Sequence, residues 1–168
     1  MTPVHFIIFW DISFFYCGFI IFNLIVFMCF KIGISPCKIS ISENLPENVY
    51  AAYQPQDKVI LIRQGMDAPD IFRALSQELA HAHMDRGEYN RADCAFTAYC
   101  VSYMLCKRNS IAVDTFRFDR LPEAFKEMDA QGIRAELGKI RDVANEISRD
   151  MAPVLEQRKA PSRDDGAR

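Results

Sequence analysis

An uncharged run of 19 residues, residues 12–30, constrains this chain more than any other feature. As an α-helix the run would be about 28 Å long at 1.5 Å per residue, which matches the apolar core of a bilayer. It shows no polar stripe, whereas an amphipathic helix on a soluble core has one. We therefore expect residues 1–37 to be a hydrophobic leader whose N-terminal helix is long enough to span a membrane.

The charges beside this run predict an orientation. Lys31 and Lys38 follow it and no Lys or Arg precedes it, so the positive-inside rule leaves the C-terminal domain in the cytoplasm. The leader also has an alternative origin. Residues 1–50 contain no Ala and no Arg, whereas the remainder contains 17 Ala and all 13 Arg. Translated AT-rich DNA has this composition, so a misassigned start is the second interpretation, and the protein would then be cytoplasmic.

The rest of the chain has the composition of one globular domain. The whole sequence has 168 residues, a net charge of −2 and a pI near 5.9, which argues against nucleic-acid binding through bulk positive charge. No pair of cysteines has the C-x-x-C spacing of zinc knuckles. We assign residues 38–156 to the domain and residues 157–168 to a charged tail that we expect to be disordered.

Hydrophobic periodicity predicts an α+β domain with a β-hairpin followed by about four helices. Residues 38–42 alternate as a short strand, and residues 49–53 and 59–62 are apolar runs joined by turn residues. Helices are expected at four places in the chain: 67 to about 84, 91–108, 121–128, and 133 to about 155. Pro153 is expected to disturb the end of the last one.

The first of these helices carries the most informative motif, Gln77-Glu78-Leu-Ala-His81. In a zincin, H-E-x-x-H places two His ligands one helical turn apart to bind Zn²⁺, and the Glu polarises the metal-bound water. Here Gln77 stands at the first ligand position, while Glu78 and His81 match the pattern. His83 cannot replace Gln77, because it lies about 200° around the helix from His81. An ordinary polar helix face, with His81 hydrogen-bonded to a carboxylate, is the alternative interpretation.

The motif and its surroundings resemble a known family. The order of hairpin, E-L-A-H-A helix and apolar helix with an acid near its start resembles the ImmA/IrrE-type zincin-like metallopeptidase domains. From Pro46 to about Met151 the chain looks still more like a peptidase-like domain in large proteins of conjugative mobile elements. The stretches that carry this resemblance are Leu-Pro-Glu-Asn-Val-Tyr, Ile-Arg-Gln-Gly-Met-Asp-Ala-Pro and Ala-Tyr-Cys-Val-Ser-Tyr-Met-Leu-Cys-Lys-Arg.

The resemblance implies roles for individual residues. His81 would be a metal ligand and Glu78 the general base. Asp93 would be the third ligand, from the segment Asn-Arg-Ala-Asp-Cys-Ala-Phe-Thr-Ala-Tyr, with Glu88 as a substitute. Gln77 departs from the family, because a neutral amide is a weak ligand for Zn²⁺. We therefore expect zinc binding to be weak or absent.

Two functional hypotheses follow. The first is a zincin-like metallopeptidase-family domain that is catalytically impaired by its Q-E-x-x-H motif. The second is a non-catalytic module that binds a protein partner, anchored to a membrane if residues 12–30 are a true span. Both predict a peptide or protein partner and no nucleic acid.

Overall fold

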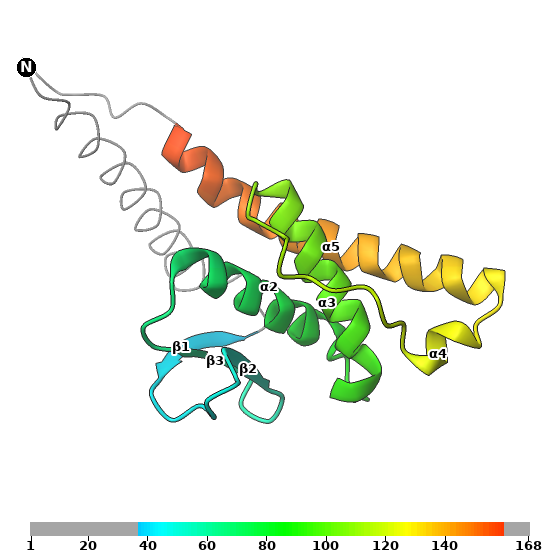
Figure 1. The fold of residues 1–168 in the computed structure, drawn as a ribbon. Coiled ribbons are helices and arrows are strands. Elements are labelled where there is room, and N and C mark those ends of the chain that lie inside the picture. The colour runs from blue at the N-terminus through cyan, green and yellow to red at the C-terminus, as the bar shows by residue number, and fades with distance from the viewer. Residues whose placement is uncertain (1–36, 160–168) are drawn as a thin grey trace, which may run out of the picture.

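The computed structural model describes the backbone of residues 37–159 and the side chains of residues 37–152 (Figure 1). Within these residues the fold is α+β, with one three-stranded sheet and four helices, as the periodicity predicted. The predicted span at residues 12–30 lies outside the described residues, as do residues 160–168 of the tail predicted at 157–168. Between residues 37 and 159, no helix combines the length and apolarity needed to cross a membrane.

The sheet contains the predicted strand and hairpin. β1 (Lys38–Ser42), β2 (Ala51–Gln54) and β3 (Val59–Arg63) lie in the order β1-β3-β2. β2 and β3 are antiparallel, as a hairpin requires, and β1 runs parallel to β3 on its other side. The central strand buries Ile60 and Ile62 at alternate positions, so one face of the sheet contributes to the core.

The motif helix, α2 (Ala68–Met84), begins and ends where the sequence predicts. Asp67 caps it by accepting a hydrogen bond from the backbone N–H of Asp70 at 2.8 Å, and Pro69 lies in its first turn. One side of α2 packs on β2 and β3, and other sides pack on α3 (Arg91–Arg108) and α5 (Ala130–Lys159) (Figure 1). A helix covered in this way can keep polar side chains only if they find partners.

The two remaining helices differ from the predicted boundaries. The helix expected at 121–128 is reduced to α4 (Glu123–Lys126), which has no buried residue. Phe125 packs on Phe96 of α3 with ring centroids 4.6 Å apart, but a helix with no fully buried residue gains little from further turns. The helix expected from 133 to about 155 is longer, since α5 begins at Ala130 and its backbone stays helical through Pro153 to Lys159. A proline removes one backbone hydrogen bond, and the neighbouring turns of α5 keep theirs.

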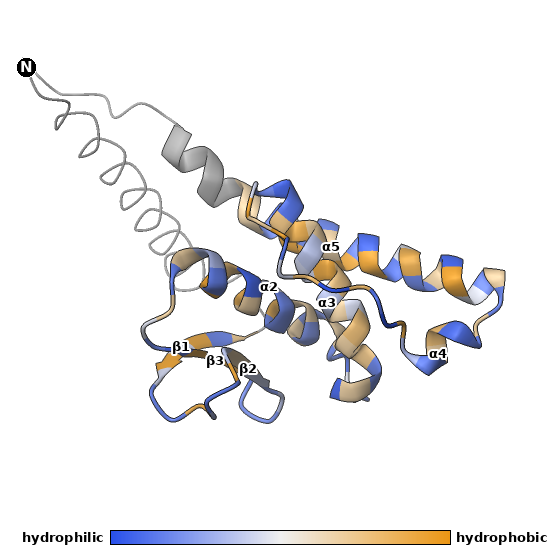
Figure 2. Cartoon of the chain, viewed as in Figure 1, coloured by the Kyte–Doolittle hydropathy of each residue, from blue (hydrophilic) through white to orange (hydrophobic). Residues whose placement is uncertain are grey.

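The core lies between the sheet and the three long helices. α3 lies between α2 and α5, and its buried positions include Val101 and Leu105, both 0% exposed. Figure 2 shows hydrophobic and hydrophilic residues alternating along α5, as expected for an amphipathic helix with one face on the core. The outer positions of α5 include Leu137, which is 60% exposed.

The packing predicts a large difference between two leucine truncations. Leu105→Ala should lower the free energy of unfolding by about 2–5 kcal/mol, because it opens a cavity in a filled core. Leu137→Ala, the matched control on α5, should change it by no more than about 0.5 kcal/mol. Urea denaturation of the two variants measures both values. Equal losses would show that the core does not lie where α3 meets α2 and α5.

Candidate functional site

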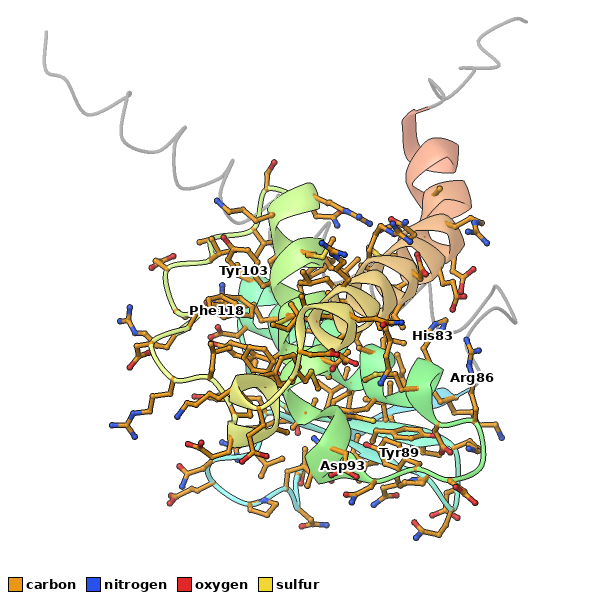
Figure 3. All side chains as sticks on the ribbon, turned by 90° about the vertical axis from the view of Figure 1, so that its right-hand side faces the viewer. His83, Arg86, Tyr89, Asp93, Tyr103 and Phe118 are labelled. Atoms are coloured by element: carbon orange, nitrogen blue, oxygen red, sulfur yellow. The ribbon has the colours of Figure 1, made fainter. Side chains whose placement is uncertain are left out.

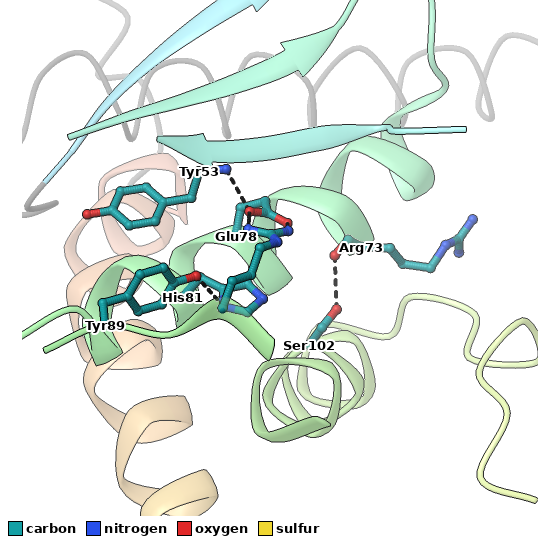
Figure 4. A network of polar contacts seen from close by, with 7 residues as sticks. Tyr53, Arg73, Glu78, His81, Tyr89 and Ser102 are labelled. Atoms are coloured by element: carbon teal, nitrogen blue, oxygen red, sulfur yellow. Dashed lines mark hydrogen bonds and ion pairs between the residues drawn. The ribbon is translucent and has the colours of Figure 1, made fainter. Parts of the chain in front are cut away.

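The candidate site is built around the carboxylate of Glu78, whose side chain is only 4% exposed. Its Oε2 accepts a hydrogen bond from the backbone N–H of Tyr53 at 2.7 Å (Figure 4). The guanidinium of Arg91 donates to both oxygens, at 2.8 Å to Oε2 and 2.6 Å to Oε1. One carboxylate therefore joins β2, α2 and α3.

Arg91 is placed for this contact by the start of α3. Asn90 caps that helix by accepting a hydrogen bond from the backbone N–H of Ala92 at 3.0 Å, so Arg91 is its first residue. A cation in the first turn is disfavoured by the helix dipole, and a specific partner must offset this cost. Glu78 supplies that partner in the two-pronged geometry that a guanidinium forms with a carboxylate. The pair raises the pKa of Arg91 further, so its charge is permanent.

His81 lies one turn after Glu78 and is 1% exposed. Its Nδ1 is 2.9 Å from the hydroxyl of Tyr89, and the two rings meet edge to face with centroids 5.9 Å apart (Figure 4). The pKa of His81 is lowered to about 4. Burial is the main cause, the positive charge of Arg91 also lowers the pKa, and the negative charge of Glu78 offsets part of the shift. His81 is therefore a neutral, buried imidazole at physiological pH.

A second polar group fixes the end of α2 to the hairpin. Asp85 accepts hydrogen bonds from the hydroxyl of Tyr53 at 2.8 Å and from Nζ of Lys58 at 2.6 Å. The hydrogen bond from Lys58 lowers the pKa of Asp85 most, and the one from Tyr53 lowers it as well. Burial and the contact with Asp85 raise the pKa of Tyr53, so the phenol stays protonated. The C-terminus of α2 is thus held to the same strand that binds Glu78.

A cleft of about 510 Å³ lies beside the Glu78–Arg91 pair. Its walls come from the approach to β2, one face of α2, α3 and the segment after α3. The lining side chains include a stripe along α2 at helical spacing: Asp70, Arg73, Ala74, Gln77 and Glu78. The opposite walls contribute Asn48, Val49, Tyr50, Ala51, Arg91, Tyr99, Ser102, Thr115 and Phe116.

Aromatic contacts hold the segment that closes this cleft. Phe116 packs on Tyr99 and Tyr103 of α3, with ring centroids 5.0 and 5.5 Å apart. Tyr103 in turn meets Phe118 at 5.1 Å, and Figure 3 shows both beside α3. The hydroxyl of Tyr99 accepts a hydrogen bond from the backbone N–H of Arg117 at 2.6 Å. This wall is therefore part of the packed domain.

The predicted site residues are distributed over different environments. Gln77 and Glu78 line the cleft, whereas His81 is buried against Tyr89. Asp93 lies in the first turn of α3 with an exposed side chain (Figure 3), and Glu88 is exposed in the loop before it.

His83 lies apart from these residues, as its place on the helix predicted. Its ring faces α5, with Nδ1 3.6 Å from a carboxylate oxygen of Glu146 and Nε2 3.9 Å from one of Asp150. It therefore contributes to the contact between α2 and α5 and supplies nothing to the cleft.

The donor atoms near the motif do not fit a zinc ion in this arrangement. A zinc site needs about three protein donors whose lone pairs converge on one point. Of the predicted ligands, His81 is buried with its Nδ1 paired to Tyr89, whereas Asp93 and Glu88 are exposed. Among the side chains that the structure describes, those of residues 37–152, no set of three from His, Cys, Asp or Glu is placed to hold a metal ion.

Comparisons with known protein families, with curated proteins and with solved structures find no match to this chain. The site must therefore be interpreted from its own residues.

Three residues at the centre were missed by the sequence analysis, namely Tyr53, Tyr89 and Arg91. Arg91 carried a usable signal, since a basic residue directly after a helix cap opposes the helix dipole and indicates a specific acidic partner. Tyr53 contributes its backbone N–H, which no side-chain pattern can reveal. Tyr89 depends on the turn between the helices, where Gly87 adopts a φ of +118° that favours glycine.

The buried imidazole predicts a pH dependence of stability. The folded pKa of His81, about 4, lies below its ordinary value of 6.5, so the unfolded chain takes up the proton first as the pH falls. The free energy of unfolding should fall by about 3 kcal/mol between pH 6.5 and 4, at about 1.4 kcal/mol per pH unit. Chemical denaturation across this range measures the loss.

His81→Gln should remove this part of the pH dependence, and the control His83→Gln should retain it. Carboxylates contribute equally to the loss of stability at low pH in both variants. The difference between the two pH profiles therefore reports on His81. Identical pH profiles would contradict the buried, neutral state of His81.

The carboxylates of the motif and of α3 should differ strongly. Glu78→Ala should cost about 2–4 kcal/mol, because it leaves the N–H of Tyr53 and half-exposed Arg91 without their acceptor. Asp93→Ala, the matched acidic control, should change stability by at most about 0.5 kcal/mol because its side chain is exposed. Thermal or urea unfolding provides the comparison, and a larger cost for Asp93 would reverse the assignment.

Proposed function

We propose that this domain is a non-catalytic, zincin-like module that binds an extended peptide segment of a protein partner along β2. The observation that carries the proposal is Ala51 of the edge strand β2, a residue that is 7% exposed and lines the cleft. A strand edge that borders a cleft can accept a further strand from a ligand.

The register of the hairpin supports the availability of this edge. The backbone N–H of Arg63 donates to the carbonyl of Tyr50 at 2.9 Å. In an antiparallel pair every second residue is hydrogen-bonded, so Ala52 and Gln54 of β2 are bonded to β3. The N–H groups of Ala51 and Tyr53 then point away from β3. That of Tyr53 is used by Glu78, and that of Ala51 lies on the same side of β2, away from β3. A peptide would therefore pair at Ala51.

The charges of the cleft favour an uncharged segment. Arg73 forms an ion pair with Asp70, and Arg91 forms one with Glu78, so the four charged linings cancel. The other walls offer amide and hydroxyl groups together with aromatic rings, among them Tyr50 and Phe116. Such a surface fits the backbone of a neutral extended peptide that presents apolar side chains.

The contacts of Glu78 favour binding over hydrolysis. A general base needs a free lone pair that reaches the proton of the water attacking the substrate carbonyl. The Glu78 carboxylate is instead turned to Arg91 and to the strand, with three hydrogen bonds to protein donors. This is the main support for the non-catalytic hypothesis over an impaired metallopeptidase.

The resemblance to peptidase-like domains of conjugative mobile elements makes a protein of such a system the proposed partner. If residues 12–30 span a membrane, the module would act at the cytoplasmic side of that membrane.

A display library of short random peptides tests the proposal with the full chain as target. Enriched peptides should bind about tenfold less tightly to Ala51→Pro, because the variant removes the outward N–H without removing a bond to β3. Ile41→Pro is the matched control. β1 forms the opposite edge of the sheet, and the N–H of Ile41 points away from β3, so the proline removes no bond within the sheet. Fluorescence anisotropy gives the affinities.

Two results of this experiment would contradict the proposal. One is that folded protein enriches no peptide, and the other is that peptides bind Ala51→Pro as well as the unaltered chain. The enriched peptides should also stay intact on incubation with the protein, as followed by mass spectrometry. Cleavage that is lost in Glu78→Gln would favour the metallopeptidase hypothesis instead.

A further inference from the structure

We propose that the end of the domain where α4 meets the start of α5 is an interface through which two copies of this chain associate about a two-fold axis. The interface consists of an apolar patch, formed by Phe118, Leu121, Ile133 and Leu137, and of the charged residues on its two sides. None of these four side chains lines the cleft beside Glu78, so the inference holds whether or not that cleft binds a peptide.

Exposed apolar side chains are concentrated at this end of the domain. Within the described residues six large hydrophobic side chains are exposed, and four of these form the patch: Phe118 at 45%, Leu121 at 51%, Ile133 at 41% and Leu137 at 60%. Single exposed apolar side chains are common on monomeric proteins, whereas a group of them marks a surface that another molecule covers.

Two adjacent residues of α3 bring the parts of the patch together. The ring of Phe96 lies 6.5 Å from that of Phe118 and 4.6 Å from that of Phe125 in α4. The hydroxyl of Thr97, the next residue, donates a hydrogen bond to Glu136 of α5. Figure 1 shows α4 beside the first turns of α5. The segments that carry the patch therefore meet at one end of the domain.

α5 carries an apolar stripe that the domain covers only in part. The members of the stripe are three or four residues apart: Ile133, Leu137, Ile140, Ala144, Ile147 and Met151. The last four are buried, whereas the first two are exposed. An amphipathic helix packs its apolar stripe on a partner surface, so the first two turns of the stripe are free to pack on another molecule.

The charges beside the patch favour a second copy of the same chain as that molecule. Residues 118–129 carry four acids and two bases. Residues 130–139 of α5 carry two exposed bases, Arg134 and Lys139, and one acid, Glu136, which is turned toward α3. A two-fold rotation places patch on patch, and it places the acidic side of each copy on the basic side of the other. The surface is therefore complementary to itself.

We expect a weak dimer, with a Kd on the order of 10 μM, because so small a patch is at the lower end of interface sizes. Leu137→Asp should raise this Kd about tenfold or more, since it places a carboxylate in the apolar contact. Leu137 is exposed in a single copy, so the change acts on association and not on the folding of that copy. Sedimentation of the full chain, in a nonionic detergent that keeps residues 12–30 in solution, measures the Kd.

Reversing the charges on one side at a time tests the two-fold arrangement. Arg134→Glu with Lys139→Glu makes both sides of a copy acidic, and Glu123→Lys with Glu127→Lys makes both sides basic. Each variant alone should dimerise about tenfold more weakly, because like charges then meet across the axis. An equimolar mixture of the two should recover most of the affinity, since each acidic copy can then pair with a basic one.

Two controls accompany this test. Lys107→Glu with Arg149→Glu reverses two exposed bases at the other ends of α3 and α5 and should leave the Kd unchanged. The recovery in the mixture should be lost when both variants also carry Leu137→Asp, which excludes attraction between oppositely charged copies at another surface. Circular dichroism shows that each variant is folded.

Three results would overturn the inference. One is a full chain that stays monomeric at about 200 μM, well above the expected Kd. Another is a mixture of the acidic and basic variants that associates no better than either variant alone. The third is association that Leu137→Asp leaves unchanged, which would assign the contact to other residues of the chain.

Discussion

The rest of this structure depends on one buried carboxylate that is shared by three elements. Glu78 lies on α2, accepts from the backbone of β2 and is paired with the first residue of α3. A buried charge of this kind is tolerated only with strong partners, and it leaves its neighbours little freedom to move. The same contacts shape the cleft beside Glu78. They fix the positions of β2 and α2, and they pair the charge of Glu78 with that of Arg91.

The polar contacts around α2 act as a set. Glu78 holds the middle of the helix to β2, and Asp85 holds its end to the same strand through Tyr53 and to the hairpin turn through Lys58. Between Glu78 and Asp85 on the chain, His81 is paired with the hydroxyl of Tyr89. A motif that a metal would organise in a zincin is organised here by protein hydrogen bonds, which is why we favour binding over catalysis.

Much of the fold could be predicted from the sequence because its signals are local. The Asp67 cap, the apolar stripe of α2 and the turn between β2 and β3 each lie within a few residues, and the structure follows them. The parallel pairing of β1 with β3 could not be predicted, since strand order depends on contacts across the sheet. Glu78 and His81 were predicted as a general base and a metal ligand, and in the structure both are buried polar residues of α2. Their partners Arg91 and Tyr89 come from another helix and a loop, and only the fold brings them together.

The sequence separation of these contacts has a consequence for the order of folding. Tyr53 and Glu78 are 25 residues apart, and Glu78 and Arg91 are 13 apart, so the centre of the site closes short loops. Contacts of this kind cost little chain entropy and form early. The hairpin and α2 can therefore assemble around Glu78 while the ribosome is still synthesising α5. The hydrogen bonds from Arg108 of α3 to α5 span 37 to 40 residues. The edge strand β2 and its contact with Glu78 would then be in place before α5 is complete.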